Sequence, residues 1–285
     1  LLRDAIGLTM ALGHRSVAAV VGHDFGASIA AMAALARPDY FRSMVLMSAP
    51  FAGAPAVPFD TAERPASRPT GPDIHAALAA LPRPRKHYQW YYSERGADAD
   101  MWRAPQGVHA FLRAYYHFKS ADWAGNRPFR LAGWTADELA KMPTYYIMDR
   151  DRDMAATVAR EMPTPAEIAA CAWLTEAELA VYAGEYGRIG FQGGLQWYRC
   201  RTSGRFDAEM EVFAGKTIDI PSAFIAGRSD WGIYQKPGAI EAMQETVCTR
   251  MLGCHLIPGA GHWVQQEQPA EVGRLLLDFL KQAGV

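Results

Sequence analysis

In the first fifty residues, the pattern of apolar and polar positions predicts helices and strands that follow one another in turn. A helical stripe begins the chain, and the small-residue stretch 27–36 predicts a second helix. Between them, the β-branched apolar run 16–21 predicts a buried strand, and 44–47 predicts another. This alternation is typical of an α/β fold with a parallel sheet. The stripe of the first helix, about 1–12, consists of Leu1, Leu2, Ala5, Ile6, Leu8 and Leu12.

The alternation stops after residue 50. Eight of the 18 prolines lie between residues 50 and 84, and this density predicts a long surface excursion because proline lacks a backbone donor. Residues 87 to about 213 are mostly helical in pattern and rich in Tyr and Trp, with capping-box spacing at Thr135–Glu138 and Thr175–Glu178. We interpret this region as a helical insert, and its aromatic content favours the proline-rich stretch as a route into a packed unit rather than a disordered linker.

Strand and helix alternate again from Ile218 onward. Strands are predicted at 221–227 and 254–258, and a closing amphipathic helix at about 269–281. The expected organisation is therefore an α/β core made of 1–55 and 216–285, with a helical domain and its proline-rich entry loop, 56–215, inserted after the second strand.

Composition narrows the classes of function. A chain of 285 residues with net charge −1 and pI near 6.8 gives no charge-based reason to bind nucleic acid or an anionic membrane, and no apolar run is long enough to span a bilayer. The four cysteines form no CxxC pair and no metal-like cluster, so we expect them to be reduced and packed. The chain begins with Leu1 and has no signal-peptide pattern; we expect a cytoplasmic protein and a fragment of a longer one.

The segment Gly22-His-Asp-Phe-Gly26 lies between the first predicted strand and the following helix. Small residues on both sides of a central nucleophile are typical of the tight strand–turn–helix elbow that pushes a side chain outward. Here the central residue is Asp24, and a carboxylate suits attack on a saturated carbon, which gives an ester that water can cleave. The ordinary alternative is a strand–helix corner with an N-cap aspartate.

Hydrolysis of such an ester needs a base. His262 follows a predicted strand in a Gly-rich loop, and Asp230 follows the strand before it, where its carboxylate would orient the imidazole. The alternatives are a structural histidine and a turn aspartate. We expect His23 to pack or hydrogen-bond behind the elbow. The remaining histidines lack such placement: His14, His75, His87, His109, His117 and His255.

At these residues the chain resembles the epoxide hydrolases of the α/β-hydrolase superfamily. Gly22–Gly26 is similar to that family's Asp elbow, and Gly261-His-Trp-Val-Gln-Gln-Glu-Gln-Pro269 is similar to its histidine loop. The order of elbow, acid and histidine is also that of α/β hydrolases. The resemblance implies that Asp24 is the nucleophile, His262 the base, Asp230 the acid, and the Phe25 N–H an oxyanion donor, beneath a helical cap.

The resemblance also implies two acid tyrosines in the cap. Gln196-Trp197-Tyr198-Arg199 resembles a family segment that indicates Tyr198, and the first cap helix indicates Tyr88, with Tyr91 or Tyr92 as alternatives. With 12 tyrosines in the chain, a packed aromatic is the ordinary interpretation of any one of them. Trp197 and Trp231 are expected at the substrate.

The sequence departs from the family in two ways. Gln196 replaces the usual Asn, and nothing matches the family's strands before the elbow or its His-Gly-x-Pro loop, which supplies a second oxyanion amide. Losing one oxyanion donor costs roughly 3–4 kcal/mol. This departure is a further reason to expect a fragment.

We therefore predict hydrolysis of a small apolar epoxide by water to a vicinal diol, with no metal or cofactor; a homodimer is one expected assembly, but the sequence does not fix the oligomeric state. One alternative is a haloalkane or haloacid dehalogenase with the same Asp-His-Asp core, although the side chain of Phe25 has no N–H like that of the Trp found beside the haloalkane dehalogenase nucleophile. Another is a non-catalytic binding protein on this fold. A serine esterase is disfavoured because no Gly-x-Ser-x-Gly occurs.

Overall fold

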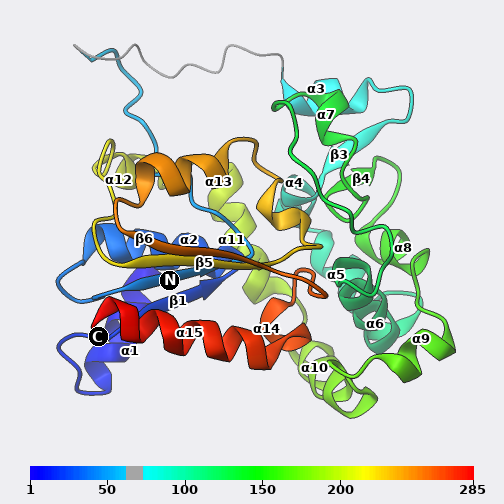
Figure 1. Cartoon of the computed structure of the whole chain (residues 1–285). Coiled ribbons are helices and arrows are strands. Elements are labelled where there is room, and N and C mark those ends of the chain that lie inside the picture. Colours follow the sequence, from blue (N-terminus) through cyan, green and yellow to red (C-terminus); the bar gives the residue numbers. More distant parts are fainter. Residues whose placement is uncertain (62–72) are drawn as a thin grey trace. The chain divides into compact units, whose positions relative to one another are not determined.

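The computed structural model describes residues 1–61 and 73–285. It divides into two compact units, one formed by Leu1–Pro69 with Asp207–Val285 and the other by Thr70–Phe206 (Figure 1). The sequence pattern places the insert at 56–215, whereas residues 207–215 group with the sheet-containing unit in the structure. The central part of the proline-rich stretch, 62–72, lies outside the described residues.

The first unit is built on a parallel sheet of four strands. Along the sheet the order is β1 (Val20–His23), β2 (Met44–Met47), β5 (Ser222–Gly227) and β6 (Met251–Ile257). Each neighbouring pair is parallel. Parallel strands end at one edge of a sheet, so the segments that follow the four strands all begin at that edge.

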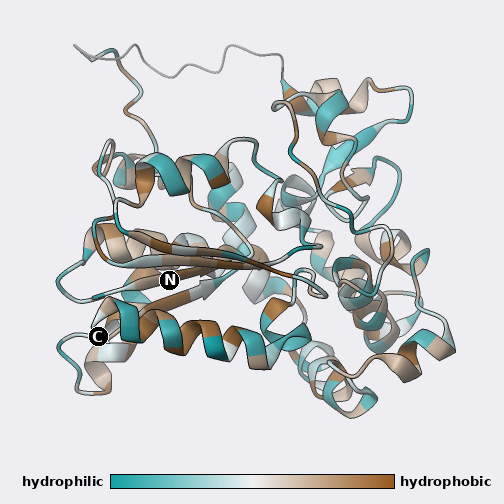
Figure 2. Ribbon diagram, viewed as in Figure 1, coloured by the Kyte–Doolittle hydropathy of each residue, from teal (hydrophilic) through white to brown (hydrophobic). Residues whose placement is uncertain are grey.

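Helices cover both faces of this sheet. Met44 and Leu46 face a core shared with α2 (Phe25–Ala36), while Val45 and Met47 face a core shared with α15 (Pro269–Ala283). Because successive side chains in a strand alternate between faces, a strand buried on both sides is apolar throughout, as β2 is. Figure 2 shows the apolar colouring along the strands and on one side of α15.

The remaining elements of this unit are short or peripheral. Leu2 and Ile6 of the first helix pack beside Tyr40 and Phe41. The elements are α1 (Leu2–Ala11), α12 (Asp207–Glu211), the 3₁₀ helix η1 (Trp231–Ile233), α13 (Ala239–Ala242), the π-helical turn η2 (Met243–Val247) and α14 (Val264–Glu267).

The first strand differs from its prediction. It covers Val20–His23 rather than 16–21, with only an isolated bridge from Val17 to Phe41 before it. It is an outer strand of the described sheet, and Val21 is 47% exposed, so the expectation of a buried strand is wrong. The β-branched run cannot distinguish an edge strand from a central one, since both favour such residues.

The second unit is mainly helical, as the sequence predicts, and its α11 packs against α4 while α10 packs against α6. The Thr175 side chain forms a complete capping box with Glu178, at a spacing that the sequence predicts. Thr164 forms a second capping box with Glu167, which was not predicted. Thr135 accepts only the Glu138 N–H. The elements are α3 (Ile74–Ala79), α4 (Tyr88–Ser93), α5 (Ala97–Trp102), α6 (Gly107–Lys119), α7 (Ala136–Leu139), α8 (Met154–Ala159), α9 (Pro165–Ala170), α10 (Glu176–Ile189), α11 (Gln192–Ser203) and the antiparallel pair β3 (Arg85–His87) and β4 (Ile147–Asp149).

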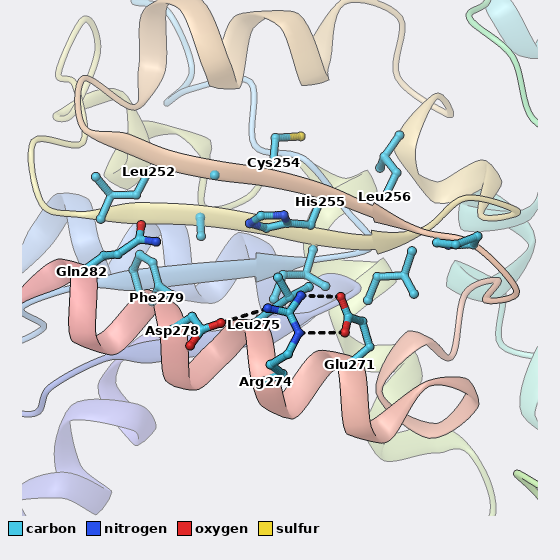
Figure 3. A pocket seen from close by; sticks show the side chains of 15 residues that line it. Leu252, Cys254, His255, Leu256, Glu271, Arg274, Leu275, Asp278, Phe279 and Gln282 are labelled. Carbon is cyan, nitrogen blue, oxygen red and sulfur yellow. Dashed lines mark hydrogen bonds and ion pairs between the residues drawn. The ribbon is translucent and has the colours of Figure 1, made fainter.

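A pocket of about 410 Å³ lies along β6 and α15 (Figure 3). Along α15, Arg274 forms ion pairs with Glu271 and Asp278, and His255 of β6 lines the opposite side of the pocket. Its lining does not include Asp24, Asp230 or His262. The site expected from the sequence is therefore elsewhere in this unit.

None of the four cysteines, all of which lie in the described residues, forms a disulfide. Cys248 is buried, but Cys200 is exposed on α11, so the expectation that all four are packed is wrong for Cys200. No helix in the described parts of the chain is long and apolar enough to cross a membrane.

The tight turn after β1 yields a test of the fold. A Cβ at Gly22 would overlap the backbone carbonyl of Gly26, whereas a Cβ at Gly26 would meet nothing within 4 Å. Because backbone cannot move aside as a flexible side chain can, we expect Gly22→Ala to lower the free energy of unfolding by about 1–3 kcal/mol or more. Gly26→Ala, the matched control on α2, should be neutral or stabilising by up to about 1 kcal/mol. Urea unfolding measures both, and equal effects would contradict the close approach.

Candidate active site

Asp24 occupies the turn between β1 and α2. Its backbone has φ 54° and ψ −121°, one of two non-glycine residues with positive φ in the described chain. Its N–H donates to the Met47 carbonyl at 3.1 Å, which ties the turn to the end of β2. Such backbone strain persists only where the surroundings enforce it. The side chain is 26% exposed. The structure thus forms the strained elbow that the sequence predicts.

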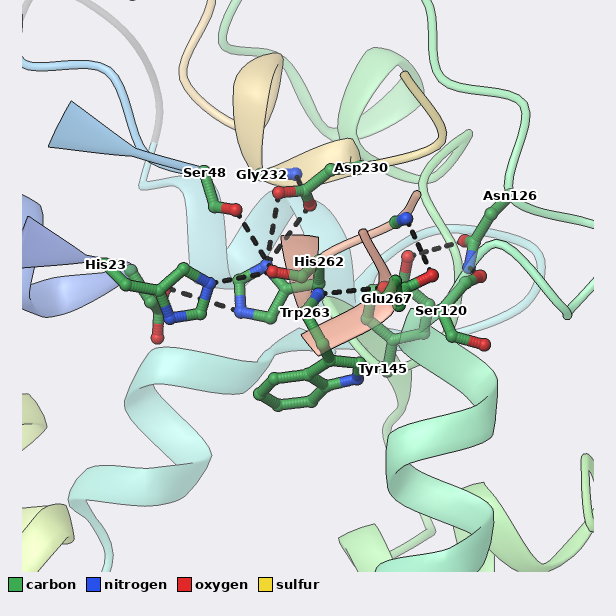
Figure 4. Close-up of polar contacts among 12 residues, drawn as sticks. His23, Ser48, Ser120, Asn126, Tyr145, Asp230, Gly232, His262, Trp263 and Glu267 are labelled. Atoms are coloured by element: carbon green, nitrogen blue, oxygen red, sulfur yellow. Dashed lines mark hydrogen bonds and ion pairs between the residues drawn. The ribbon is translucent and has the colours of Figure 1, made fainter. Parts of the chain in front are cut away.

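His262 lies in the loop between β6 and α14, with its imidazole beside Asp230 (Figure 4). Its Nδ1 is 3.2 Å from Asp230 Oδ1 and 3.3 Å from Oδ2. Oδ1 also accepts the Gly232 N–H at 2.7 Å. Since an ionised carboxylate only accepts, Nδ1 must carry the proton in this pair. In the neutral imidazole, Nε2 is then the basic nitrogen.

That basic nitrogen faces the nucleophile. His262 Nε2 is 3.8 Å from Asp24 Oδ1, a distance too long for a direct hydrogen bond. Nε2 is buried and has no hydrogen-bond partner among the described residues. A separation of this size suits a bridging water, which Nε2 could deprotonate beside the Asp24 carboxyl group. The geometry therefore matches a base that acts on water rather than one paired with the carboxylate.

The backbone of His262 is held by two side chains from neighbouring strands. Its carbonyl accepts from His23 Nε2–H at 2.7 Å and from Ser48 Oγ–H at 3.1 Å. Burial, together with the nearby His262, lowers the pKa of His23, which favours the neutral ring with its proton on Nε2. This contact confirms the expectation that His23 hydrogen-bonds behind the elbow. Ser48, which follows β2 with φ 65°, was not predicted.

The amides around His262 are held by Glu267. Its Oε2 accepts the Gly261 N–H at 2.9 Å and its Oε1 accepts the Trp263 N–H at 3.0 Å (Figure 4). Glu267 is only 9% exposed. This role was not predicted from the sequence, although a Glu four residues after Trp263 is a signal that its side chain could reach back to the backbone.

The two other residues predicted in this unit occupy contrasting positions. Phe25 is the first residue of α2, so its N–H is among the amides at a helix N-terminus, where negative charge is stabilised. Phe25 is 37% exposed. Trp231 lies in η1, directly after Asp230, and is 3% exposed. Its place at the substrate stays a prediction.

The helical unit brings the two predicted tyrosines together. Tyr88 begins α4 and Tyr198 lies on α11, and their rings meet edge to face with centroids 5.8 Å apart. The Gln89 side-chain amide donates to the Tyr88 hydroxyl at 3.2 Å. Trp197, next to Tyr198, is half-buried. The pairing joins α4 and α11 at the residues indicated by sequence.

The alternative tyrosines have structural partners within the same unit. The Tyr91 hydroxyl donates to Asp100 at 2.9 Å and accepts the Met154 N–H at 3.1 Å. The Tyr92 hydroxyl bonds that of Tyr115 at 3.3 Å, and burial raises the pKa of both Tyr91 and Tyr92. The Tyr92 ring also contacts that of Tyr198, with centroids 4.9 Å apart, so the choice of Tyr88 as the second acid stays a prediction.

The comparisons with known proteins agree with this geometry. The sequence matches the α/β-hydrolase-fold family over residues 8–269. It is 31% identical over 282 residues to epoxide hydrolase B of Mycobacterium tuberculosis, which covers 98% of this chain and 76% of that relative. This chain belongs to the epoxide hydrolases of the α/β-hydrolase family. The resemblance inferred from the elbow and the histidine loop is thereby confirmed.

Solved structures of epoxide hydrolases resemble it over nearly its whole length. An epoxide hydrolase from an endophytic Streptomyces has 28% identity and a TM-score of 0.70, covering 98% of this chain and 72% of that one. Epoxide hydrolase A from Mycobacterium thermoresistibile has 30% identity and a TM-score of 0.66, covering 99% and 74%. These likenesses confirm the α/β-hydrolase fold with its parallel sheet.

His87, the N-cap of α4, yields a pH-dependent prediction. Its Nδ1 accepts the Gln89 N–H, and burial lowers its pKa to about 3 from an ordinary 6.5. The unfolded chain therefore binds a proton that the folded chain resists, so stability falls as pH drops below about 6.5. From pH 7 to pH 5 the loss from this group is about 2 kcal/mol. His87→Asn keeps a cap acceptor without the titration, and urea unfolding should show a shallower pH slope. Parallel slopes for the two proteins would contradict this assignment.

Proposed function

We propose that this protein converts an apolar epoxide to a vicinal diol in two steps, through an ester at Asp24. The observation that carries the proposal is the placement of His262 Nε2 at 3.8 Å from the Asp24 carboxylate, with Asp230 behind the imidazole. The relatives named as epoxide hydrolases support the same reaction. The elbow supplies a carboxylate where a serine enzyme would present a hydroxyl.

In the first step, an Asp24 oxygen attacks a ring carbon of the epoxide. The carbon–oxygen bond of the ring breaks and an alkyl ester forms, while the ring oxygen takes a proton from a tyrosine hydroxyl. We propose Tyr88 and Tyr198 for this role, which the edge-to-face contact of their rings within one unit supports. A proton donor is required because an alkoxide is otherwise a poor leaving group.

In the second step, His262 Nε2 removes a proton from water, and the resulting hydroxide attacks the ester carbonyl of Asp24. We propose that the Phe25 N–H, at the start of α2, stabilises the developing oxyanion. The intermediate collapses, and the diol leaves with a proton from the imidazolium. The proton that remains on the Asp24 carboxyl group passes through solvent to the tyrosinate formed in the first step, so both the tyrosine and the carboxylate, now with one oxygen from water, are restored. Asp230 stabilises the imidazolium, since it lies 2% exposed against Nδ1.

Other aspects of the function stay predictions. We propose that the helical unit is the cap, and that Trp197 and Trp231 contribute to the substrate pocket. The homodimer and the cytoplasmic location expected from the sequence are likewise predictions.

Trapping of the ester tests the covalent route. His262→Asn keeps the elbow but removes the base, so incubation with styrene oxide should give a protein heavier by one epoxide, with turnover reduced at least about 100-fold. Asp24→Asn, the matched control, should take up no mass. With the unaltered protein, repeated turnover in oxygen-18 water should place label in the Asp24 carboxyl group. Turnover without label would rule out the ester, and halide release from brominated alkanes without diol would favour a dehalogenase.

The tyrosines can be tested in the same assay. Tyr88→Phe and Tyr198→Phe should each slow formation of the ester by about 10²–10⁴-fold, because each removes a proton donor or its partner. Tyr91→Phe removes a hydroxyl that is bonded to Asp100 and should change ester formation far less. Pre-steady-state quench kinetics measure this step. Equal losses for all three variants would point to packing rather than to acid catalysis.

A further inference from the structure

We propose that Glu267 is a positioning residue for the base, and that it acts on hydrolysis of the ester rather than on its formation. The inference rests on the proposed two-step reaction. The observation behind it is that one buried carboxylate accepts the amide N–H groups of both neighbours of His262, at 2.9 Å from Gly261 and 3.0 Å from Trp263.

These contacts fix the peptide that follows the imidazole. The His262 carbonyl and the Trp263 N–H belong to one peptide group, so this group is held at one end by His23 and Ser48 and at the other by Glu267. The peptide is planar and moves as one unit. With both ends held, the Cα of His262 can shift little, and Asp230 then sets the direction of its ring through Nδ1.

A merely structural role for Glu267 would be to cap α14. Such a cap needs only the bond to the Trp263 N–H, because Trp263 is the residue before that helix. The second bond goes past His262 to Gly261 and contributes nothing to the helix. Burying a carboxylate is costly unless its oxygens accept strong hydrogen bonds, and here each oxygen has an amide donor. The two bonds together hold the loop on both sides of the base.

Glutamine separates these two roles. Its carbonyl oxygen can replace one carboxylate oxygen, but its NH₂ group only donates, so it would face another N–H donor across the loop. Glu267→Gln therefore keeps the shape of the side chain and one amide bond while removing the second. Glu267→Asp retains the charge but is too short by one methylene to reach both amides.

The kinetic signature follows from the order of steps. Ring opening fixes kcat/KM, whereas ester hydrolysis enters kcat and KM alike. A residue that acts only on the second step changes kcat and KM in the same proportion and leaves kcat/KM almost constant. A variant that damages the whole site lowers kcat/KM, and one that only destabilises the fold lowers the amount of active protein.

The experiment compares Glu267→Gln with the wild-type protein and with Glu271→Gln, which makes the same change at a partly exposed position paired with Arg274. For styrene oxide we expect Glu267→Gln to lower kcat and KM together by roughly 10- to 100-fold, the effect of a base displaced by about 1 Å. Mass spectrometry should show accumulated ester at Asp24. Glu271→Gln should leave all three quantities unchanged.

Several outcomes would overturn the proposal. A loss in kcat/KM as large as that in kcat, or no accumulation of ester, would show that Glu267 does not act selectively on hydrolysis. If Glu267→Gln does not fold, as judged by urea unfolding, Glu267→Asp should give the same kinetic pattern; wild-type kinetics in that variant would contradict the inference. Absence of diol with the wild-type protein would instead refute the proposed function itself, and the inference with it.

Discussion

The site depends on the close approach of two glycines at the end of β1. The backbone carbonyl of Gly26 occupies the space where a Cβ of residue 22 would lie, so the chain can reverse direction within the three residues between them. Asp24, in the middle, takes a positive φ that a relaxed chain would avoid. The strain is sustained by packing on both sides, because α2 is buried against the sheet over most of its length. A carboxylate held by backbone geometry alone would be far less defined.

Much of this could be inferred from the sequence because local patterns determine it. The strand Met44–Met47 was predicted at its observed bounds. The elbow, Asp230 and His262 each follow a strand that is recognisable in the sequence by a run of apolar residues. The parts that were missed depend on contacts between distant segments. The local sequence around Ser48 does not indicate that its hydroxyl donates to the His262 carbonyl, because that hydrogen bond joins residues 214 positions apart. The exposure of Val21 likewise depends on what lies beside β1.

In the helical unit, the sequence was most informative where capping chemistry is local, as at Thr175, and least where an aromatic cluster forms. The pairing of Tyr88 with Tyr198 joins α4 to α11 across more than a hundred residues, and only the family resemblance indicated it. The sequence does not decide among Tyr88, Tyr91 and Tyr92, because the partners of their hydroxyl groups, such as Asp100 for Tyr91, come from other elements. Patterns of residue type place aromatic side chains in a core but do not assign their hydroxyl groups.

Of the two outer strands of the described sheet, β1 (Val20–His23) contains neither Lys, Arg, Asp, Glu nor Pro, whereas β6 is followed by Pro258 and lies beside the ion pairs of Arg274. Charged residues and proline discourage the addition of another strand to an edge. Within the described residues, the backbone of β1 is therefore the less protected of the two edges, and it lies a few residues before the nucleophile.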